Sequence, residues 1–274
     1  MAREKVTARR ILKMKGERPI VAVTAYDYPT AWIAEDAGVD VILVGDSLGM
    51  VVLGYPSTLQ VTLDDMVRHT AAVARAARSP LIVADMPFGS YESSVTSAVE
   101  SAIALVRAGG EAVKLEGGSE YADRVKAIVD AGIPVMGHLG LTPQRALRIG
   151  GYRPRARGRG EARELLLDAE SLVEAGVFSI VLEFVSEEAA EIVTRRLPVP
   201  TICIGSGRRC DGQILVFHDI VGLSRLTPPF AKKYVDARRI MLEALSRYAE
   251  DVRAGRFPSE EHVVHAKEPL DDLD

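Results

Sequence analysis

Residues 41–47 read VILVGDS, an apolar run that stops at an acid, Asp46. A β-strand needs no such residue, and burying a charge without a partner is costly. Successive strands of an α/β barrel bring the polar groups at their ends into one pocket. The pattern therefore predicts an enzyme and indicates which end of the barrel holds its site. Four further apolar runs end in the same way: LIVADMP at 81–87 with Asp85, AVKLEGG at 112–118 with Lys114 and Glu116, VMGHLG at 135–140 with His138, and IVLEFV at 180–185 with Glu183.

The number of apolar runs favours a closed (β/α)8 TIM barrel over an open doubly wound sheet. Their near-continuous hydrophobicity is typical of parallel strands that are covered on both faces. Ala-Gly pairs recur where a helical pattern gives way to a strand, as expected for short turns closed by glycine. Eight strands are predicted, over residues 20–24, 39–44, 81–84, 112–115, 135–138, 179–183, 201–204 and 214–217.

No segment rich in Pro, Gly or Ser divides the chain. We therefore expect one barrel domain over residues 1–274, with a C-terminal helix over 231–254 and a polar tail over 257–274. A barrel of about 250 residues fits this length. Thr62 is a plausible N-cap for the helix that follows it. The other helices are predicted over 27–35, 63–78, 93–108, 120–131, 159–175 and 187–196.

The composition is that of an ordinary globular protein, with 47% hydrophobic and 26% charged residues. The net charge of −4 gives no reason to expect a nucleic-acid or membrane partner. No apolar run approaches the roughly 18 residues of a membrane span, and the basic start lacks the apolar core of a signal peptide. The two cysteines, Cys203 and Cys210, are too few for a disulfide framework. These features predict a soluble cytoplasmic protein.

Asp46 and Asp85 are candidate metal ligands. Carboxylates at the ends of adjacent strands lie close together, and a hard divalent cation relieves their repulsion. Mg²⁺ favours oxygen ligands from one or two carboxylates, with waters and substrate completing its shell. Glu116 follows on the next strand and is expected to ligate the ion directly or through water. The competing interpretation is that each aspartate only caps the helix after its strand.

Lys114 and Glu116 flank Leu115, so strand alternation puts both side chains on one face. Inside the barrel, the lysine would hold a substrate carboxylate or the oxygen of an enolate. A simple interior Lys–Glu pair is the alternative.

Glu183 is surrounded by apolar residues, which raise the pKa of a carboxyl group and suit a general base near neutral pH. A buried glutamate paired to an arginine is the competing interpretation. His138 is either a structural hydrogen bonder or part of the pocket, and Ser47 offers a hydroxyl and a backbone N–H to an anion.

The segment 145–163, RALRIGGYRPRARGRGEAR, is rich in arginine and glycine. It contains one aromatic residue, Tyr152, and belongs to an acidic chain, which argues against RNA binding. A basic loop over the pocket, attracting an anionic substrate or carrier, is the preferred interpretation.

Several long strings resemble the ketopantoate hydroxymethyltransferase family. They are VGDSLGM at 44–50, ADMPF at 84–88, VKLEGG at 113–118, GHLGLTPQ at 137–144, the GGY…GRG loop, VLE at 181–183 and DGQILVFHD at 211–219. The resemblance runs from about residue 21 to 262. It implies a barrel of the phosphoenolpyruvate/oxo-acid enolate type and a Mg²⁺-dependent step in pantothenate and coenzyme A biosynthesis.

The resemblance also implies the substrates and the residue roles. A one-carbon unit from 5,10-methylenetetrahydrofolate, or from a tetrahydromethanopterin analogue, is added to 3-methyl-2-oxobutanoate to give 2-dehydropantoate. Glu183 would accept a proton, and a homo-oligomer, commonly of ten subunits, is expected. The metal would be bound by Asp46, Asp85 and Glu116, and the 2-oxo acid by Asp46, Ser47, Asp85, Lys114 and His138.

Two other interpretations remain. A carbon–carbon lyase of the related isocitrate lyase group would use a cysteine between the fourth and fifth strands, and none is present there. A non-catalytic binding barrel would not need the full set of ionisable residues. One departure from the family pattern lies at 204–211, IGSGRRCD, where Gly-Ala-Gly followed by small residues is expected. Its two arginines are expected to affect the site that binds the one-carbon carrier.

Overall fold

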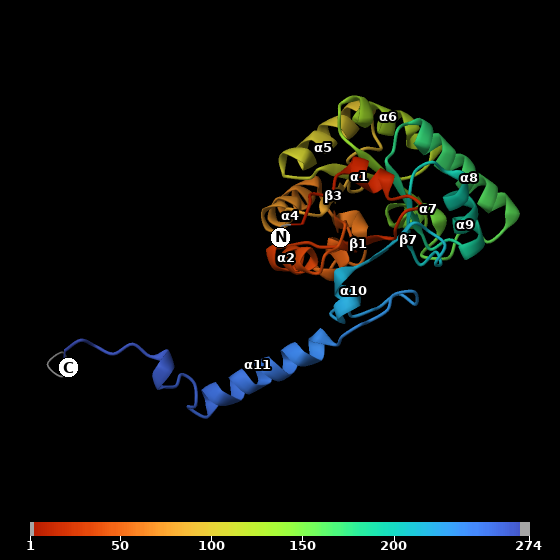
Figure 1. Ribbon diagram of the computed structural model, residues 1–274. Helices are drawn as coiled ribbons and strands as arrows, with labels where there is room; N and C mark the ends of the chain where they lie inside the picture. Colours follow the sequence, from red (N-terminus) through yellow and green to blue (C-terminus); the bar gives the residue numbers. More distant parts are fainter. Residues whose placement is uncertain (1–2, 269–274) are drawn as a thin grey trace.

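In the computed structural model, which describes residues 3–268, parallel strands form a closed barrel ordered β1 to β8 (Figure 1). The predicted barrel is confirmed, and most strand bounds agree within one or two residues. The last strand begins at Gly212 rather than Ile214, because the glycine packs against β1 with no room for a side chain. The strands are β1 (Ile20–Thr24), β2 (Val41–Val44), β3 (Leu81–Asp85), β4 (Ala112–Glu116), β5 (Val135–Gly140), β6 (Ser179–Glu183), β7 (Thr201–Ile204) and β8 (Gly212–Leu215).

Helices that follow the strands form a ring around the barrel (Figure 1). The ring contains α2 (Tyr28–Asp36), α4 (Leu63–Ala76), α5 (Val95–Arg107), α6 (Ala122–Asp130), α8 (Arg159–Glu174) and α9 (Glu187–Arg196). Thr62 is the N-cap of α4, as predicted, and forms a capping box with Asp65.

Short helical segments were not predicted, because four to six residues carry little periodic signal. They are α1 (Ala8–Lys13), α3 (Leu48–Val51), α7 (Ala146–Ile149), α10 (Phe217–Val221) and the 3₁₀ turns at Thr58–Gln60, Ser119–Tyr121, Pro143–Arg145 and Glu260–His262.

The core has two parts, because successive strand residues point to opposite sides of the barrel wall. On β2, Val41 and Leu43 pack inside the barrel, whereas Ile42 and Val44 pack against the helices. On β4, Ala112 belongs to the inner cluster. Lys114 and Glu116 lie two and four residues further along the same face, so both side chains point into the barrel.

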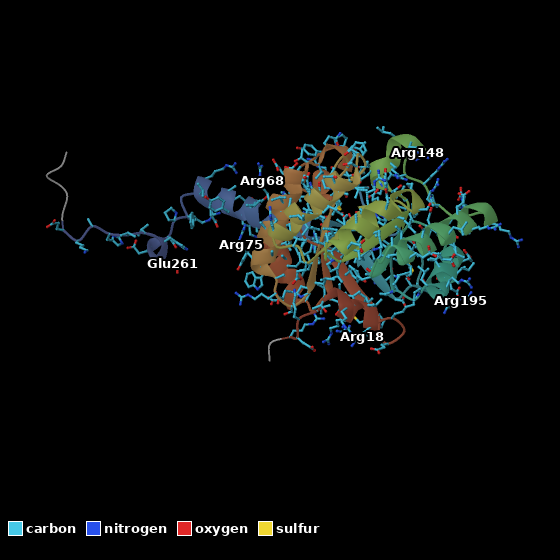
Figure 2. The ribbon with its side chains drawn as sticks, turned by 90° about the horizontal axis from the view of Figure 1, so that it is seen from above. Arg18, Arg68, Arg75, Arg148, Arg195 and Glu261 are labelled. Atoms are coloured by element: carbon cyan, nitrogen blue, oxygen red, sulfur yellow. A yellow bond between two sulfur atoms is a disulfide. The ribbon has the colours of Figure 1, made fainter. Side chains whose placement is uncertain are left out.

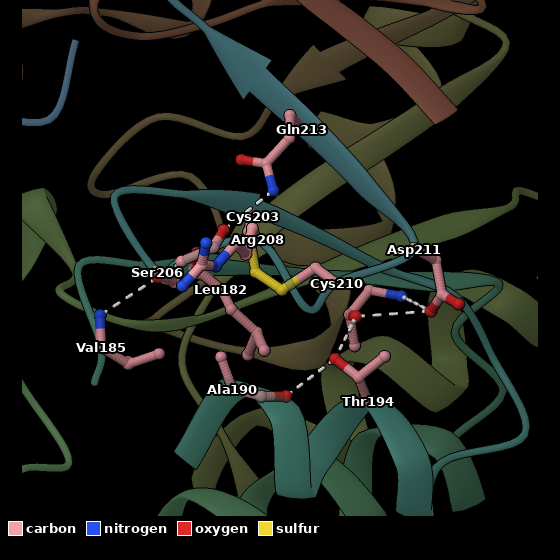
Figure 3. Close-up of a disulfide and its surroundings, with 12 residues drawn as sticks. Leu182, Val185, Ala190, Thr194, Cys203, Ser206, Arg208, Cys210, Asp211 and Gln213 are labelled. Atoms are coloured by element: carbon pink, nitrogen blue, oxygen red, sulfur yellow. Dashed lines mark hydrogen bonds between the residues drawn. A yellow bond between two sulfur atoms is a disulfide. The ribbon is translucent and has the colours of Figure 1, made fainter. Parts of the chain in front are cut away.

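Strands β7 and β8 are joined without a helix by the crossover, residues 205–211. A disulfide between Cys203 and Cys210 closes this connection (Figure 3). Their Cα atoms lie 6.0 Å apart, within the usual range for a bridge. The cysteine count had indicated no disulfide framework, and it did not predict this single bridge.

The C-terminal helix α11 (Ala237–Arg253) extends away from the barrel (Figure 1). It begins six residues later than predicted. Tyr234 donates its backbone N–H to Ile220 O at 2.8 Å, which holds the preceding segment extended, and the Asp236 side chain then caps the helix. None of its residues is buried. Within residues 3–268, no helix combines the length and apolar character needed to cross a membrane. The acidic end of the predicted tail, 269–274, lies outside the described residues.

Candidate active site

The ionisable residues predicted from the strand ends lie together at the carboxyl end of the barrel. Asp46 follows β2, Asp85 ends β3, and Lys114 and Glu116 belong to β4. His138 lies on β5 and Glu183 ends β6, and these two side chains are in contact. All except Glu183 are buried, and the Glu183 side chain is 17% exposed. Burying this many ionisable groups requires mutual compensation.

Asp85 connects the first three strands of the site. Its Oδ1 lies 2.7 Å from Lys114 Nζ, and its Oδ2 accepts a 3.0 Å hydrogen bond from the backbone N–H of Asp46. The ion pair with Lys114 does not have hydrogen-bond alignment, so Oδ1 is a buried oxygen that accepts no hydrogen bond from the described residues. Gly45 permits this approach, since a Cβ there would lie 2.8 Å from Ser47 Oγ and 3.4 Å from Asp85 Oδ2.

A chain of contacts leads from Lys114 through His138 to Glu183. Lys114 Nζ lies 3.1 Å from His138 Nδ1, and His138 Nε2 lies 3.1 Å from Glu183 Oε2. An ammonium group only donates, so Nδ1 must accept and the proton of neutral His138 is on Nε2, facing the glutamate. Burial, and then the charge of Lys114, hold the pKa of His138 well below its usual value. His138 is therefore neutral, and its Nε2–H faces Glu183 without forming an aligned hydrogen bond among the described residues.

Burial raises the pKa of Glu183 to about 7, and Lys114 opposes the shift. A carboxylate with this pKa is a stronger base than an exposed glutamate and is still ionised near neutral pH. The competing Glu–Arg pair is not found among the described residues, where the basic side chain in contact with Glu183 is the neutral His138.

The site carries more negative than positive groups. Four carboxyl groups, Asp46, Asp85, Glu116 and Glu183, surround the single ammonium of Lys114. Burial, and then the neighbouring acids, raise the pKa of both Asp46 and Glu116 above their ordinary values. Burial alone would lower the pKa of Lys114, but the charges of Asp85, Glu116 and Asp46 raise it. Additional positive charge would stabilise this cluster.

The arrangement fits a divalent cation held by two carboxylates. Asp85 has a buried oxygen without a hydrogen bond, and Asp46 lies directly beside it. Glu116 is less available, because its Oε2 accepts the backbone N–H of Gln144 at 3.1 Å. The described residues contain no group of three His, Cys, Asp or Glu side chains arranged as metal ligands. Two carboxylates completed by water and substrate are the usual Mg²⁺ environment.

Three buried residues of the site were not predicted from the sequence. Gln144 donates from Nε2 to Asp46 Oδ2 at 2.9 Å and to Met86 O at 3.0 Å. Tyr91 donates to Gln144 Oε1 at 2.8 Å, and the hydroxyl of Tyr26 lies 2.8 Å from Ser47 Oγ. The only signal for Gln144 is a polar amide just after the fifth apolar run. These partners fix the orientation of Asp46 and Ser47.

The basic segment 145–163 lies along the edge of the site. Arg145 pairs with Glu120 and stacks over the ring of Tyr121 at 4.8 Å. Arg155 donates its backbone N–H to Phe184 O at 2.8 Å, next to Glu183. Tyr152 is half exposed, and burial followed by the charges of the site's carboxylates raises its pKa. The predicted loop is therefore adjacent to the carboxylate cluster.

A protein-family model described as ketopantoate hydroxymethyltransferase matches residues 5–260. The chain belongs to the ketopantoate hydroxymethyltransferase family. It is 89% identical over 273 residues to the 3-methyl-2-oxobutanoate hydroxymethyltransferase of Aeropyrum pernix, covering 100% of both chains. It is 63% identical to the protein of the same name from Ignicoccus hospitalis, covering 94% of this chain and 98% of that one. The family identifies this chain as an enzyme, a hydroxymethyltransferase.

Solved structures with a similar barrel are distant in sequence. Phosphonopyruvate hydrolase superposes with a TM-score of 0.63 at 14% identity, covering 96% of this chain and 92% of that one. A 2,3-dimethylmalate lyase of the PEP mutase/isocitrate lyase superfamily gives 0.61 at 20% identity, covering 94% and 92%. These likenesses establish the fold of this ketopantoate hydroxymethyltransferase family member and not its reaction.

Proposed function

We propose that this enzyme transfers a hydroxymethyl group to 3-methyl-2-oxobutanoate, giving 2-dehydropantoate for pantothenate and coenzyme A biosynthesis. The donor is 5,10-methylenetetrahydrofolate or a tetrahydromethanopterin analogue. The names of the close relatives support the acceptor. The observation that carries the proposal is the partly buried Glu183, whose pKa is about 7 and whose carboxylate faces a neutral His138.

Glu183 is the proton acceptor in this proposal. It takes the proton from C3 of the oxo acid, and C3 then forms a bond to the methylene carbon of the donor. One water supplies the hydroxyl group and both carbon–nitrogen bonds of the methylene bridge break. The two carrier nitrogens take up the proton removed from C3 and one proton of the water, and the carrier leaves as the free tetrahydropterin. His138 Nε2 lies 3.1 Å from this carboxylate and gives it a polar neighbour.

Lys114, Ser47 and the backbone of Asp46 hold the oxo acid. The Lys114 ammonium, fixed between Asp85 and His138, is directed at the side of the site where negative charge develops on the substrate oxygen. Because it is held in place before the reaction, it needs no reorganisation. Tyr26 orients the Ser47 hydroxyl, and Asp85 and His138 complete the pocket wall.

Asp46 and Asp85 would hold Mg²⁺, with Glu116 in contact through water. The bound ion would polarise the substrate's oxygens and offset the negative charge that forms there. Gln144 donates to Oδ2 of Asp46, and Oδ1 accepts no hydrogen bond from the described residues.

We further propose that the chain is a single barrel domain that works as a cytoplasmic homo-oligomer, a decamer as expected from the family. The large apolar side chains of α11 are at least 45% exposed in the single chain, among them Leu245 and Tyr248, which supports an interface role. Light scattering on the purified chain tests this part. A monomer would contradict it.

The reaction is tested by incubating the enzyme with 3-methyl-2-oxobutanoate, methylenetetrahydrofolate and Mg²⁺. We expect 2-dehydropantoate and tetrahydrofolate in equal amounts. A tetrahydromethanopterin donor in a parallel reaction identifies the preferred carrier. Failure of both donors, or cleavage of the oxo acid instead of addition, would contradict the proposed function.

A further inference from the structure

The crossover between β7 and β8 contacts the strand that carries Glu183. From this contact we propose that Ser206, which lies in the crossover, is a positioning residue for Glu183. The inference rests on the proposed function in one respect, namely that Glu183 accepts the substrate proton. Its structural basis can be tested separately.

Ser206 bonds to the backbone on both sides of the glutamate. Its Oγ donates to Leu182 O at 2.8 Å and accepts from the N–H of Val185 at 3.1 Å (Figure 3). Ile204 O lies further from Ser206 Oγ, at 3.2 Å, so the single hydroxyl proton is best donated to Leu182 O. The side chain is buried, with 1% exposure, so water does not compete for these bonds.

The strand needs this support because its regular pairing stops at Glu183. The last partners of Glu183 are Gly140 on β5 and Ile204 on β7. The next residue, Phe184, has φ of +49°, a left-handed conformation that is unfavourable for a non-glycine residue. Strain of this kind persists only where surrounding contacts impose it. Beyond that point the N–H of Phe184 bonds to Ile204 O, and Arg155 pairs with Val185 on the other side. Ser206 accepts the N–H of Val185 itself, the hydrogen bond that β7 would otherwise provide.

The crossover is itself held in place at several points. The Cys203–Cys210 disulfide joins β7 to the end of the crossover. The backbone N–H of Arg208 donates to Glu187 at 3.2 Å, and Gln213 donates to Gly207 O at 2.9 Å. Ser206 therefore bonds to β6 from a constrained segment, as precise placement of a catalytic group requires. Of the two arginines in the crossover, Arg208 pairs with Glu187.

The test compares Ser206→Ala with Ser206→Thr, which keeps the hydroxyl, and with Ser179→Ala. Ser179 is an equally buried serine at the opposite end of β6, and its hydroxyl has no partner within residues 3–268. In Ser206→Ala we expect kcat for deuterium uptake at C3 of 3-methyl-2-oxobutanoate to fall roughly tenfold, with KM within about twofold, because binding is retained while the base is misplaced. Ser206→Thr should recover most of kcat.

Amide hydrogen exchange of Val185 provides a readout that does not depend on the reaction. It should accelerate about tenfold in Ser206→Ala, the equivalent of one lost hydrogen bond, and stay unchanged in Ser179→Ala. Unchanged Val185 exchange, a wild-type kcat in Ser206→Ala, or an equal fall in both alanine variants would overturn the inference. If the wild type takes up no deuterium with or without methylenetetrahydrofolate while Val185 responds as expected, the proposed function fails and the hydrogen-bonding role of Ser206 stands.

Discussion

Acidic residues lie at both ends of the barrel, but the cations and hydrogen-bond donors that compensate their charge differ between the two ends. Arg18 and Arg148 mark these opposite ends in Figure 2. At the amino end, Asp40 is 1% exposed and accepts from Arg3 at 2.8 Å, Arg18 at 2.7 Å and the backbone N–H of Val21 at 3.0 Å. Its charge is therefore fully compensated.

The same arrangement recurs around the amino end. Asp211 accepts from Lys15 and from the backbone N–H of Thr201, both at 2.9 Å. Glu111 accepts from Lys5 at 2.6 Å and from the Ile82 N–H at 3.0 Å. Each acid has its own cation and its own backbone donor, whereas at the carboxyl end four acids share Lys114.

The difference indicates what each end is for. Compensated acids fix strand ends and contribute to stability, while undercompensated ones are available to bind a cation and to exchange protons. This division agrees with the general location of TIM-barrel active sites at the carboxyl ends of the strands. The division predicts that substitutions at the carboxyl end lower activity, whereas substitutions at the amino end lower stability.

The largest effect is expected from Glu183→Gln. Removing the base should lower turnover by about 10³-fold or more, while 2-oxo acid binding stays nearly unchanged. The melting temperature should not fall, since the amide removes a carboxylate that burial disfavours. Product formation and differential scanning calorimetry measure the two quantities. Wild-type turnover in this variant would remove Glu183 as the proton acceptor.

Mg²⁺ should distinguish the two ends without reference to turnover. At a concentration 100 times its Kd, the ion should raise the free energy of unfolding of the wild type by about 2.7 kcal/mol. Asp85→Asn should lose most of this gain, whereas Asp40→Ala should retain it. Thermal unfolding in MgCl₂, against KCl of equal ionic strength, checks this. Equal responses of both variants would place the ion elsewhere.

Asp40→Ala tests the amino end. The change removes hydrogen bonds from two partly exposed guanidinium groups and one backbone N–H, so we expect a loss of about 2 kcal/mol in unfolding free energy. Activity per folded molecule should be unchanged. Urea unfolding and active-site titration provide the values. A fall in kcat would show that the two ends are coupled.

The pH dependence should give the smallest effect, about tenfold per unit below the pKa of the base. With a pKa of about 7, Glu183 ionises as the pH rises, so proton abstraction should increase up to about pH 7 and then level off. Its effect on stability has the opposite sign. Between 4.5 and about 7 the folded state keeps a proton that the unfolded state has lost, so this group's contribution to stability falls as the pH rises.

The midpoint near pH 7 should be the same in Asp40→Ala, whose substitution lies at the far end of the barrel. Rate measurements in buffers of constant ionic strength determine it. A midpoint near 4.5, the ordinary value for glutamate, would contradict the environment described for Glu183.

Local sequence patterns were sufficient to predict the barrel and to place many of its polar groups. The apolar runs mark the strands, and alternation around Leu115 puts Lys114 and Glu116 on one face. The raised pKa that was expected for Glu183 agrees with the shift that burial produces.

Contacts that depend on barrel closure could not be predicted in this way. Gln144 reaches Asp46 across 98 positions of sequence, and Tyr91 reaches Gln144 across 53. For neither residue does the sequence periodicity indicate which residue it contacts. The start of α11 was misplaced for a similar reason, because the hydrogen bond from Tyr234 to Ile220 competes with helix formation. Helix propensity depends on local sequence alone and does not reflect such competition from distant residues.

The most direct measurement is proton NMR of 3-methyl-2-oxobutanoate in D₂O with enzyme and Mg²⁺, without any carrier. The wild type should collapse the methyl doublet as C3 takes up deuterium, and Glu183→Gln should leave the doublet intact. Adding methylenetetrahydrofolate to the same sample establishes whether the donor must bind first. A doublet that persists in the wild type even then, or that collapses equally fast in Glu183→Gln, would contradict the account.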